Sequence, residues 1–138
     1  MIRRRFILTG IALVAAPWTP ARALPDEVAT LIRILAAGAT PQSGRVKLEL
    51  PLLVENGNAV GMTVTGPPGT RSLHVFAERN PNPEVVAATF GPASARPRLM
   101  TRIRLATSQT VIAVARCEDG TVWTDGVELI VTLAACLE

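Results

Sequence analysis

Seven short stretches of alternating apolar and polar residues, separated by turn residues, constrain the fold of this chain more than any other feature. They cover residues 45–50, 59–66, 72–77, 84–91, 98–106, 109–117 and 121–133. Alternation with a period of two gives a strand one buried and one exposed face. About seven such strands with turns every 8–12 residues are typical of two packed sheets. We therefore predict an all-β, immunoglobulin-like β-sandwich over residues 24–133.

Turn and helix signals complete this prediction. The sequence Glu-Asp-Gly at residues 118–120 predicts a hairpin between the last two strands. The sequence Asn-Pro-Asn-Pro at residues 80–83 predicts a loop, because proline cannot donate a hydrogen bond in a central strand. Residues 25–37 have apolar side chains at helical spacing, with Pro25 suited to a first turn and Gly38 to a helix end. We expect one short N-terminal helix there.

The first 23 residues have the features of an export signal. A basic start is followed by an apolar stretch over residues 6–16 and by the small-x-small sequence Ala-Arg-Ala. An apolar stretch this short falls below the roughly 20 residues that span a membrane. Arg3 and Arg4, followed after one residue by Phe6, fit the twin-arginine pattern. We predict a twin-arginine-type signal peptide at residues 1–23, a periplasmic protein and no stable membrane anchor; a retained N-terminal anchor is the alternative.

The positive charge of the chain belongs to this segment. Of 14 lysines and arginines, four lie in the first 23 residues, which contain no acidic residue; the rest of the chain has 10 basic and 11 acidic side chains. A phosphate-binding protein needs a basic surface on its folded domain. We predict no nucleic-acid partner.

No group of residues in the sequence is typical of an enzyme site. His74, the single histidine, lies in an alternating stretch, where a histidine is more often structural than catalytic. No cysteine–histidine cluster has metal-ligand spacing, and no glycine-rich phosphate loop follows a strand. We predict no catalytic residue, no metal and no cofactor. Arg98, Arg102 and Arg104 share one strand face, which is either solvated or a contact for an anion or acidic partner.

The two cysteines are predicted not to pair with each other. Cys117 precedes the hairpin turn, and Cys136 follows a thirteen-residue strand that leads away from it. Such a strand extends roughly 40 Å, whereas a disulfide needs Cα atoms about 4.4–6.8 Å apart. Cys117 is then a partly buried small residue, and Cys136 is a free thiol near the terminus. An idle thiol in an oxidising compartment is a liability, which favours a use for Cys136.

A covalent carrier needs a thiol on a thin terminal arm that enters the active sites of other proteins. The thiolate is the reactive form of such a group. Ala134 and Ala135 are small enough for this arm, whereas Leu137 and Glu138 are bulkier. We predict that residues 134–138 form the arm and that Cys136 is the attachment point.

Four stretches resemble a known family of sulfur-oxidation carriers, the SoxY family. They read VENGN at 54–58, HVFAERNPNP at 74–83, TRIRLATSQTV at 101–111 and GVELIVTLAAC at 126–136. The resemblance covers residues 44–136. It implies an immunoglobulin-like sandwich, a periplasmic location and a heterodimer with SoxZ, a related β-sandwich. It also implies that separate periplasmic enzymes load and process sulfur intermediates on the arm cysteine, whose matching position is Cys136.

The arm departs from the pattern of that family, whose arm ends Gly-Gly-Cys-Gly-Gly. Ala134 and Ala135 replace two glycines, and Leu137 and Glu138 replace the other two. Alanine restricts the backbone more than glycine does, so this arm is stiffer, bulkier and acidic at its tip. The chain resembles a SoxY-related paralogue group whose arm reads Ala-Ala-Cys-Ile-Glu. This departure indicates a changed cargo or a changed partner enzyme.

Two hypotheses follow for the function. In the first, Cys136 carries a sulfur-containing group, thiosulfate-derived or other, between periplasmic sulfur-oxidation enzymes. In the second, the sandwich is a non-covalent docking or assembly partner and Cys136 has no role. Replacement of Cys136 by serine distinguishes them. An independent enzyme is a third reading, weakened by the absence of an acid–base set in the sequence.

Overall fold

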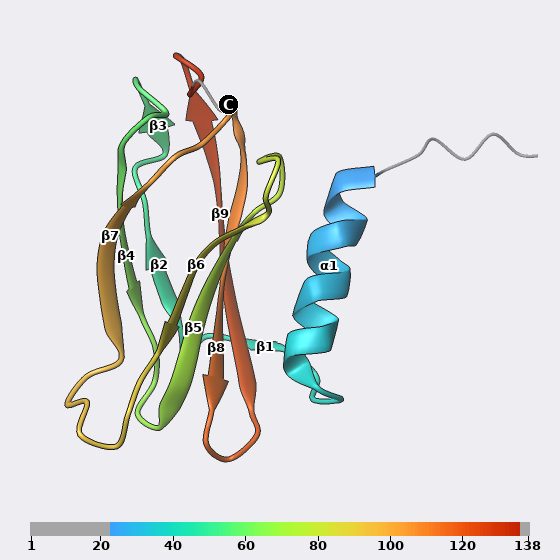
Figure 1. Ribbon diagram of the computed structural model, residues 1–138, viewed down its shortest axis with the longest axis vertical. Helices are drawn as coiled ribbons and strands as arrows, with labels where there is room; N and C mark the ends of the chain where they lie inside the picture. The colour runs from blue at the N-terminus through green and yellow to red at the C-terminus, as the bar shows by residue number, and fades with distance from the viewer. Residues whose placement is uncertain (1–22, 136–138) are drawn as a thin grey trace, which may run out of the picture.

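Two β-sheets face each other in the computed structural model, which describes residues 23–135 (Figure 1). The elements are α1 (Ala23–Ala36), β1 (Gln42–Ser43), β2 (Lys47–Glu49), β3 (Leu53–Val54), β4 (Val60–Thr65), β5 (Thr70–Ala77), β6 (Glu84–Thr89), β7 (Arg98–Ile103), β8 (Gln109–Cys117) and β9 (Val122–Val131). One sheet has the order β1-β9-β8-β5-β6, with β3 also paired to β9; the other has the order β2-β4-β7. The predicted immunoglobulin-like sandwich is confirmed.

Each of the seven predicted stretches overlaps one strand of the structure, with β5 beginning two residues before its predicted start, and the helix begins and ends within two residues of the prediction. Five of the seven strands are shorter than predicted. The differences of three residues are at β2 within 45–50, at β7, which ends at Ile103, and at β9, which covers Val122–Val131 of 121–133. The sequence did not predict β1 and β3. Each has two residues and pairs in parallel with β9, so neither is long enough to show an alternating pattern.

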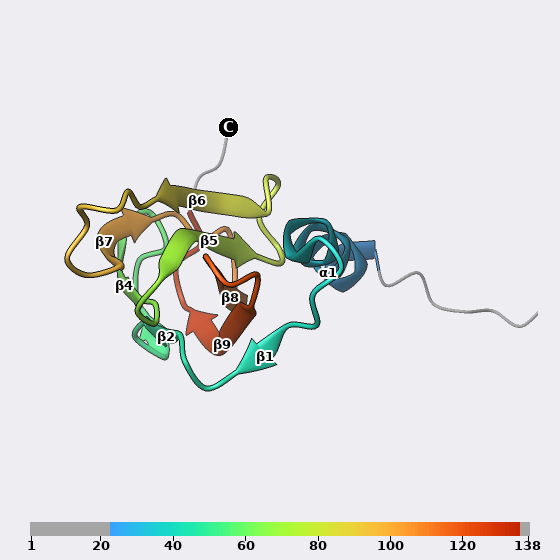
Figure 2. The ribbon, with the colours of Figure 1, turned by 90° about the horizontal axis from the view of Figure 1, so that it is seen from below.

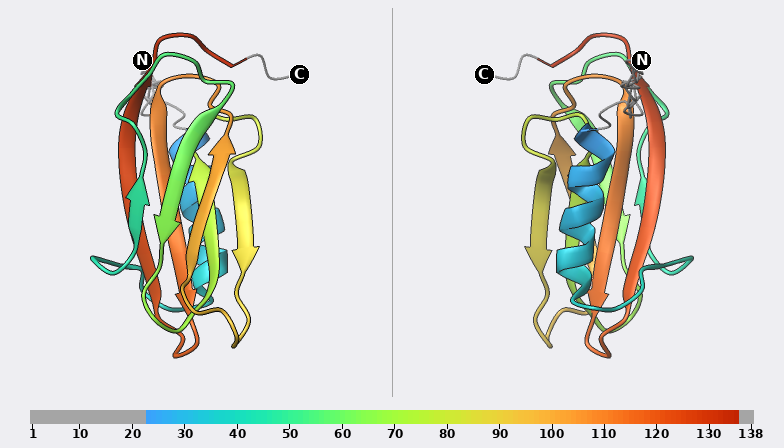
Figure 3. Two further views of the ribbon diagram at one scale, coloured as in Figure 1. Left: turned by 90° about the vertical axis from the view of Figure 1, so that its left-hand side faces the viewer. Right: turned by 90° about the vertical axis from the view of Figure 1, so that its right-hand side faces the viewer.

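The core lies between the sheets and consists of the inward-facing side chains that the alternation predicted. The fully covered side chains include Val64, Leu73, Val75, Leu105 and Val111. Burial of such side chains stabilises a fold by about 1.5–3 kcal/mol each. The outer face of the larger sheet has a second apolar cluster, in which Val28 of α1 packs with Phe76, Val114 and Val122. Figures 2 and 3 show α1 covering this face.

The helix ends where the sequence predicted. Gly38 has a φ of 92°, a left-handed conformation that glycine adopts without strain. The N–H of Ala39 donates to the carbonyl of Ala36 at 3.0 Å, which closes the last turn. The chain then turns along β1 toward the three-stranded sheet (Figure 2).

The two long sides of the sandwich differ. On one side, the Leu48 N–H of β2 donates to Asp125 Oδ2 of β9 at 2.9 Å, so a carboxylate joins the two sheets. On the other side lie β6 and β7, each paired to one strand within the described residues. Their outer backbone edges are therefore free in this part of the chain.

The predicted signal peptide, including Arg3, Arg4 and Phe6, lies outside the described residues, and its prediction stays a prediction. Within residues 23–135 no helix is long and apolar enough to cross a membrane.

Candidate functional site

The described chain stops one residue before the predicted attachment point. Cys136, Leu137 and Glu138 lie outside the described residues, whereas Ala134 and Ala135 lie within them. The site is therefore built from residues 132–135, here called the arm root. Figure 3 shows the arm root passing over the end of the sandwich after β9.

Backbone hydrogen bonds hold the arm root to the domain. The Gly57 N–H donates to the Leu133 carbonyl at 2.9 Å, and the Ala135 N–H donates to the Leu105 carbonyl at 3.3 Å. The Leu105 N–H in turn donates to the Gly57 carbonyl at 2.8 Å. The arm root is thus joined to two loops, and those loops are joined to each other.

Gly57 can make these bonds because it has no side chain. A Cβ at this position would collide with the Leu105 backbone oxygen and would lie 3.1 Å from the Ala135 nitrogen. The turn around Gly57 is shaped by Asn56, whose Oδ1 accepts the Asn58 N–H at 3.0 Å. This is the conformation in which a short polar side chain substitutes for a backbone turn.

Two buried amide side chains fix the loop that carries Leu105. Asn80 Nδ2 donates to the Arg104 carbonyl at 2.8 Å, and Asn80 Oδ1 accepts the Ala106 N–H at 2.9 Å. Gln109 Nε2 donates to the same Asn80 oxygen at 3.0 Å. Asn80 and Gln109 are 7% and 5% exposed, so this network is almost fully desolvated. A satisfied buried network of this kind holds a loop in one conformation.

The end of β9 is fixed as well. The Thr132 N–H donates to the Val54 carbonyl at 2.9 Å, and the Val131 N–H donates to Ser108 Oγ at 2.9 Å. The strand therefore reaches the arm root with bonds on both of its edges.

Three of the stretches that carry the family resemblance supply either the residues bonded to the arm root or the amides that support the loop of Leu105. Gly57 lies in the first, Asn80 in the second, and Leu105 and Gln109 in the third. Sequence reasoning identified Ala134 and Ala135 as arm residues but did not identify these four as the residues that hold the arm. Their positions inside the three resembling stretches were the signal that could have found them.

Cys117 lies at the other end of the molecule, where β8 turns into β9 (Figure 1). The Cys117 N–H donates to the Thr121 carbonyl at 2.9 Å, which closes the predicted hairpin. Its thiol is half-buried and lies 4.0 Å from Thr70 Oγ1. The hairpin and the partial burial of Cys117 are confirmed, and Ala135 lies at the opposite end of β9. The predicted absence of a bond to Cys136 concerns a residue outside the described range.

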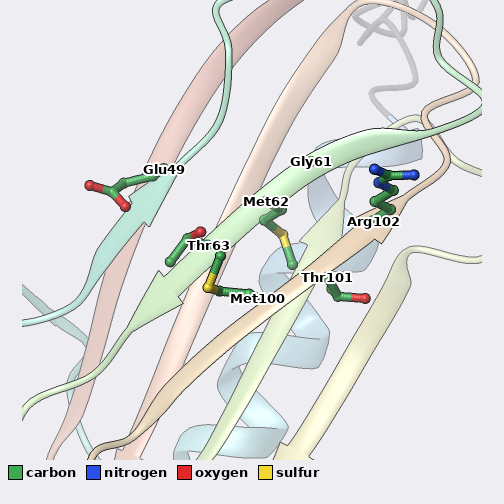
Figure 4. A pocket seen from close by; sticks show the side chains of 7 residues that line it. All are labelled: Glu49, Gly61, Met62, Thr63, Met100, Thr101 and Arg102. Atoms are coloured by element: carbon green, nitrogen blue, oxygen red, sulfur yellow. The ribbon is translucent and has the colours of Figure 1, made fainter.

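Arg98, Arg102 and Arg104 are exposed and make no ion pair with a described residue. Arg102 borders a shallow hollow on the outer face of the three-stranded sheet, beside Met100 and Gly61 (Figure 4). Glu49, across the hollow on β2, pairs with Lys47 instead, at 3.0 Å. The three side chains are exposed to solvent in the described structure. Arg98 and Arg102 lie on β7, whereas Arg104 lies in the loop that carries Leu105, next to the arm root.

His74 lies on the outer face of β5, stacked on Phe76 with 6.4 Å between ring centroids. Its Nε2 contacts Ser72 Oγ at 3.2 Å, whereas its Nδ1 is buried without a hydrogen bond, 3.9 Å from Glu84 Oε2. Burial lowers the pKa of His74 from its usual 6.5; Glu84 opposes this shift and Arg116 adds to it. This is a packed side chain far from the arm root, in agreement with the structural interpretation.

Among residues 23–135, no three His, Cys, Asp or Glu side chains come close enough to hold a metal ion.

One family model matches most of this chain, and solved structures of two kinds of protein share its fold. Residues 31–136 match the family model described as "Sulfur oxidation protein SoxY". A solved structure of the sulfur carrier protein SoxY from Chlorobium limicola f thiosulfatophilum has a TM-score of 0.69 and 22% identity, over 79% of this chain and 99% of that one. A superoxide reductase (neelaredoxin) from Ignicoccus hospitalis has a TM-score of 0.56 and 20% identity, over 70% and 85%. These two likenesses show the fold. No curated protein sequence matches the chain.

The contacts of Gly57 predict a specific loss of stability. Gly57→Ala forces the Leu105 carbonyl away and should lower the free energy of unfolding by about 1–3 kcal/mol, as overpacking does. Gly61→Ala is the matched control, because a Cβ there meets nothing within 4 Å. Alanine loses less conformational freedom on folding than glycine does, so this substitution should raise the free energy of unfolding by about 0.5–1 kcal/mol. Urea unfolding measures both. Equal effects at the two positions would contradict the close approach at Gly57.

The environment of His74 predicts a pH dependence of stability. Because its pKa is lowered in the folded state, the unfolded chain binds the proton more strongly. The contribution of neutral His74 to the free energy of unfolding is then fully present above pH 6.5, and it decreases as the pH falls below that value. Urea midpoints at about pH 7.5 and about pH 6 should differ more in the unmodified protein than in His74→Gln. The same difference in both proteins would show that His74 is not the responsible group.

Proposed function

Because its residues 31–136 match the SoxY family model, this chain belongs to the SoxY family of sulfur oxidation proteins, and on that premise we propose that it is a covalent carrier. In this proposal Cys136 holds a sulfur intermediate on a short C-terminal arm and presents it to separate periplasmic enzymes. The chain itself supplies the thiol and its placement, and the enzymes supply the catalysis. The signal-like first 23 residues support export to the periplasm.

One observation carries the proposal: two of the family-resembling stretches are bonded to the arm root, and a third supports the loop that one of them forms. The hydrogen bonds of Gly57 and Leu105 hold Leu133 and Ala135 at the end of the sandwich, and Cys136 is the next residue in the chain. A carrier gains from this arrangement, since a thiol that always leaves the domain at one place is easier for an enzyme to capture.

The chemistry of loading defines what the chain needs from its enzymes. Joining the Cys136 thiol to the outer sulfur of thiosulfate forms one S–S bond and releases one proton and two electrons. A separate oxidising enzyme must accept those electrons. The reacting form of the thiol is the thiolate, which forms at the surface as the proton leaves to water.

The sequence at the tip of the arm is an argument that the cargo or the enzyme differs from that of a Gly-Gly-Cys-Gly-Gly arm. Leu137 and Glu138 add a branched side chain and a charge next to the thiol. An entrance shaped for two glycines rejects both on steric grounds. We therefore propose a sulfur-containing cargo and leave thiosulfate as the first compound to test.

A β-sandwich partner related to SoxZ is part of this proposal. The edge strand β6 has one charged residue, Glu84, followed by Val, Val, Ala, Ala and Thr, and its outer edge pairs with no described strand. An edge of this kind attracts another strand. The edge strand β7 carries Arg98 and Arg102, and charged side chains on an edge strand disfavour its pairing with a strand of another chain. We propose that the partner covers β6.

The carrier role predicts that Cys136, and not Cys117, holds the adduct. Protein purified natively from the periplasm should show a reductant-labile mass increase that maps to Cys136. Cys136→Ser should lose the adduct and the pathway activity with no loss of fold, whereas Cys117→Ser, the matched control, should keep both. Full pathway activity in Cys136→Ser would favour the docking-module hypothesis. The adduct mass identifies the cargo.

The free edge of β6 predicts that the purified chain does not behave as a simple monomer. Size-exclusion chromatography should show self-association that increases with concentration. Ala87→Lys places a charge on an exposed position of β6 and should reduce this association without loss of the core. A monomer at all concentrations would count against an obligate partner on this edge.

A further inference from the structure

Four of the six large apolar side chains that are strongly exposed among the described residues lie beside the arm root. Leu52, Leu53, Ile130 and Leu133 are 68%, 60%, 59% and 60% exposed. We call these four residues the apolar collar. The other two, Ile34 and Met100, lie on the helix and on β7. Exposed apolar residues are ordinary when they are scattered, but a group of them marks a contact surface.

The members of the collar come from two segments that are bonded to each other. Leu53 of β3 is in register with Ile130 of β9, and the Ile130 N–H donates to the Leu52 carbonyl at 2.9 Å. Leu133 follows three residues later and is held by Gly57. A shallow hollow continues from the collar along the side of the sandwich; it is lined by five apolar residues, Leu48, Leu50, Pro51, Leu52 and Val127, and by Glu49.

The short distance between Ala135 and Cys136 determines what must approach the collar. Ala135 is bonded to Leu105, and Cys136 comes directly after it, with a Cα–Cα separation of about 3.8 Å. A protein that reacts with the Cys136 thiol must therefore bring its surface into contact with the arm root and with the side chains around it.

We propose that the apolar collar is the docking surface for the enzyme that reacts with Cys136; this inference rests on the carrier function proposed above. The partner surface that fits is an apolar rim around a narrow entrance, edged by basic groups. The basic edge follows from Glu55 and Glu128, which are exposed beside the collar and pair with no described cation. Such contacts bury apolar area that is open in the free chain, which drives association.

The test measures the initial rate at which the reduced full-length carrier gains a Cys136 adduct. The probe is an undialysed periplasmic fraction of the native host, supplemented with thiosulfate, and the readout is intact mass. Leu53→Gln/Ile130→Thr should slow the rate by at least about tenfold. The threonine keeps a β-branched residue in the strand. Met100→Gln, 67% exposed on the other sheet, is the matched control and should leave the rate unchanged.

Two further measurements keep the result unambiguous. All variants should react equally with a small thiol reagent and should unfold at the same urea concentration, which shows that the thiol and the fold are intact. Leu52→Gln/Leu53→Gln is the second variant if the first one is unstable. Slow enzymatic loading with normal small-molecule reactivity is the expected result.

Three outcomes would overturn the inference. Equal loading rates in all variants would remove the docking role of the collar and leave the carrier function standing. No adduct on the unmodified protein would contradict the carrier function itself, and the collar would lose its basis. A collar variant that abolishes self-association of the pure protein, with no effect on loading, would identify the collar as an interface between copies of this chain.

Discussion

The contact of Gly57 with the Leu105 carbonyl determines the geometry of this molecule's functional end. Two loops from different strands approach so closely that only a residue without a Cβ fits between them. The same two residues supply the donor and the acceptor that hold the arm root. If the loops separate, the bonds to Leu133 and Ala135 lose their shared support. The placement of the arm root therefore depends on a contact between parts of the chain about 50 residues apart.

The buried amides Asn80 and Gln109 explain why the core becomes polar just beneath the arm. A loop that leaves β7 before β8 begins has carbonyl and N–H groups that no strand satisfies. Asn80 satisfies two of them, at Arg104 and Ala106, and Gln109 satisfies another at Thr107. An unpaired buried group would cost about 1–3 kcal/mol. The polar network therefore fixes one loop conformation where an apolar core could not.

The sequence predicted the parts of the fold that depend on local pattern. Alternation located the strands, the Glu-Asp-Gly turn located the hairpin and Gly38 located the helix end. It did not predict β1 and β3, which exist through pairing with β9 rather than through a pattern of their own. Nor did it predict the requirement for Gly57, because a close approach between distant segments leaves no local trace. The prediction of Ala134 and Ala135 as arm residues rests on a local feature, small residues beside a thiol, and stays a prediction.

The hydrogen bonds between the arm root and the domain give a physical reason for alanine, in place of glycine, at positions 134 and 135. An arm that swings freely gains from glycine, which adopts many conformations at little cost. An arm that is held by its Ala135 N–H loses conformational entropy on being held, and alanine has less to lose than glycine. The Ala-Ala sequence thus favours the held state. In the proposed carrier role, a held arm leaves recognition to the surface around its exit, where Leu53 and Ile130 are exposed.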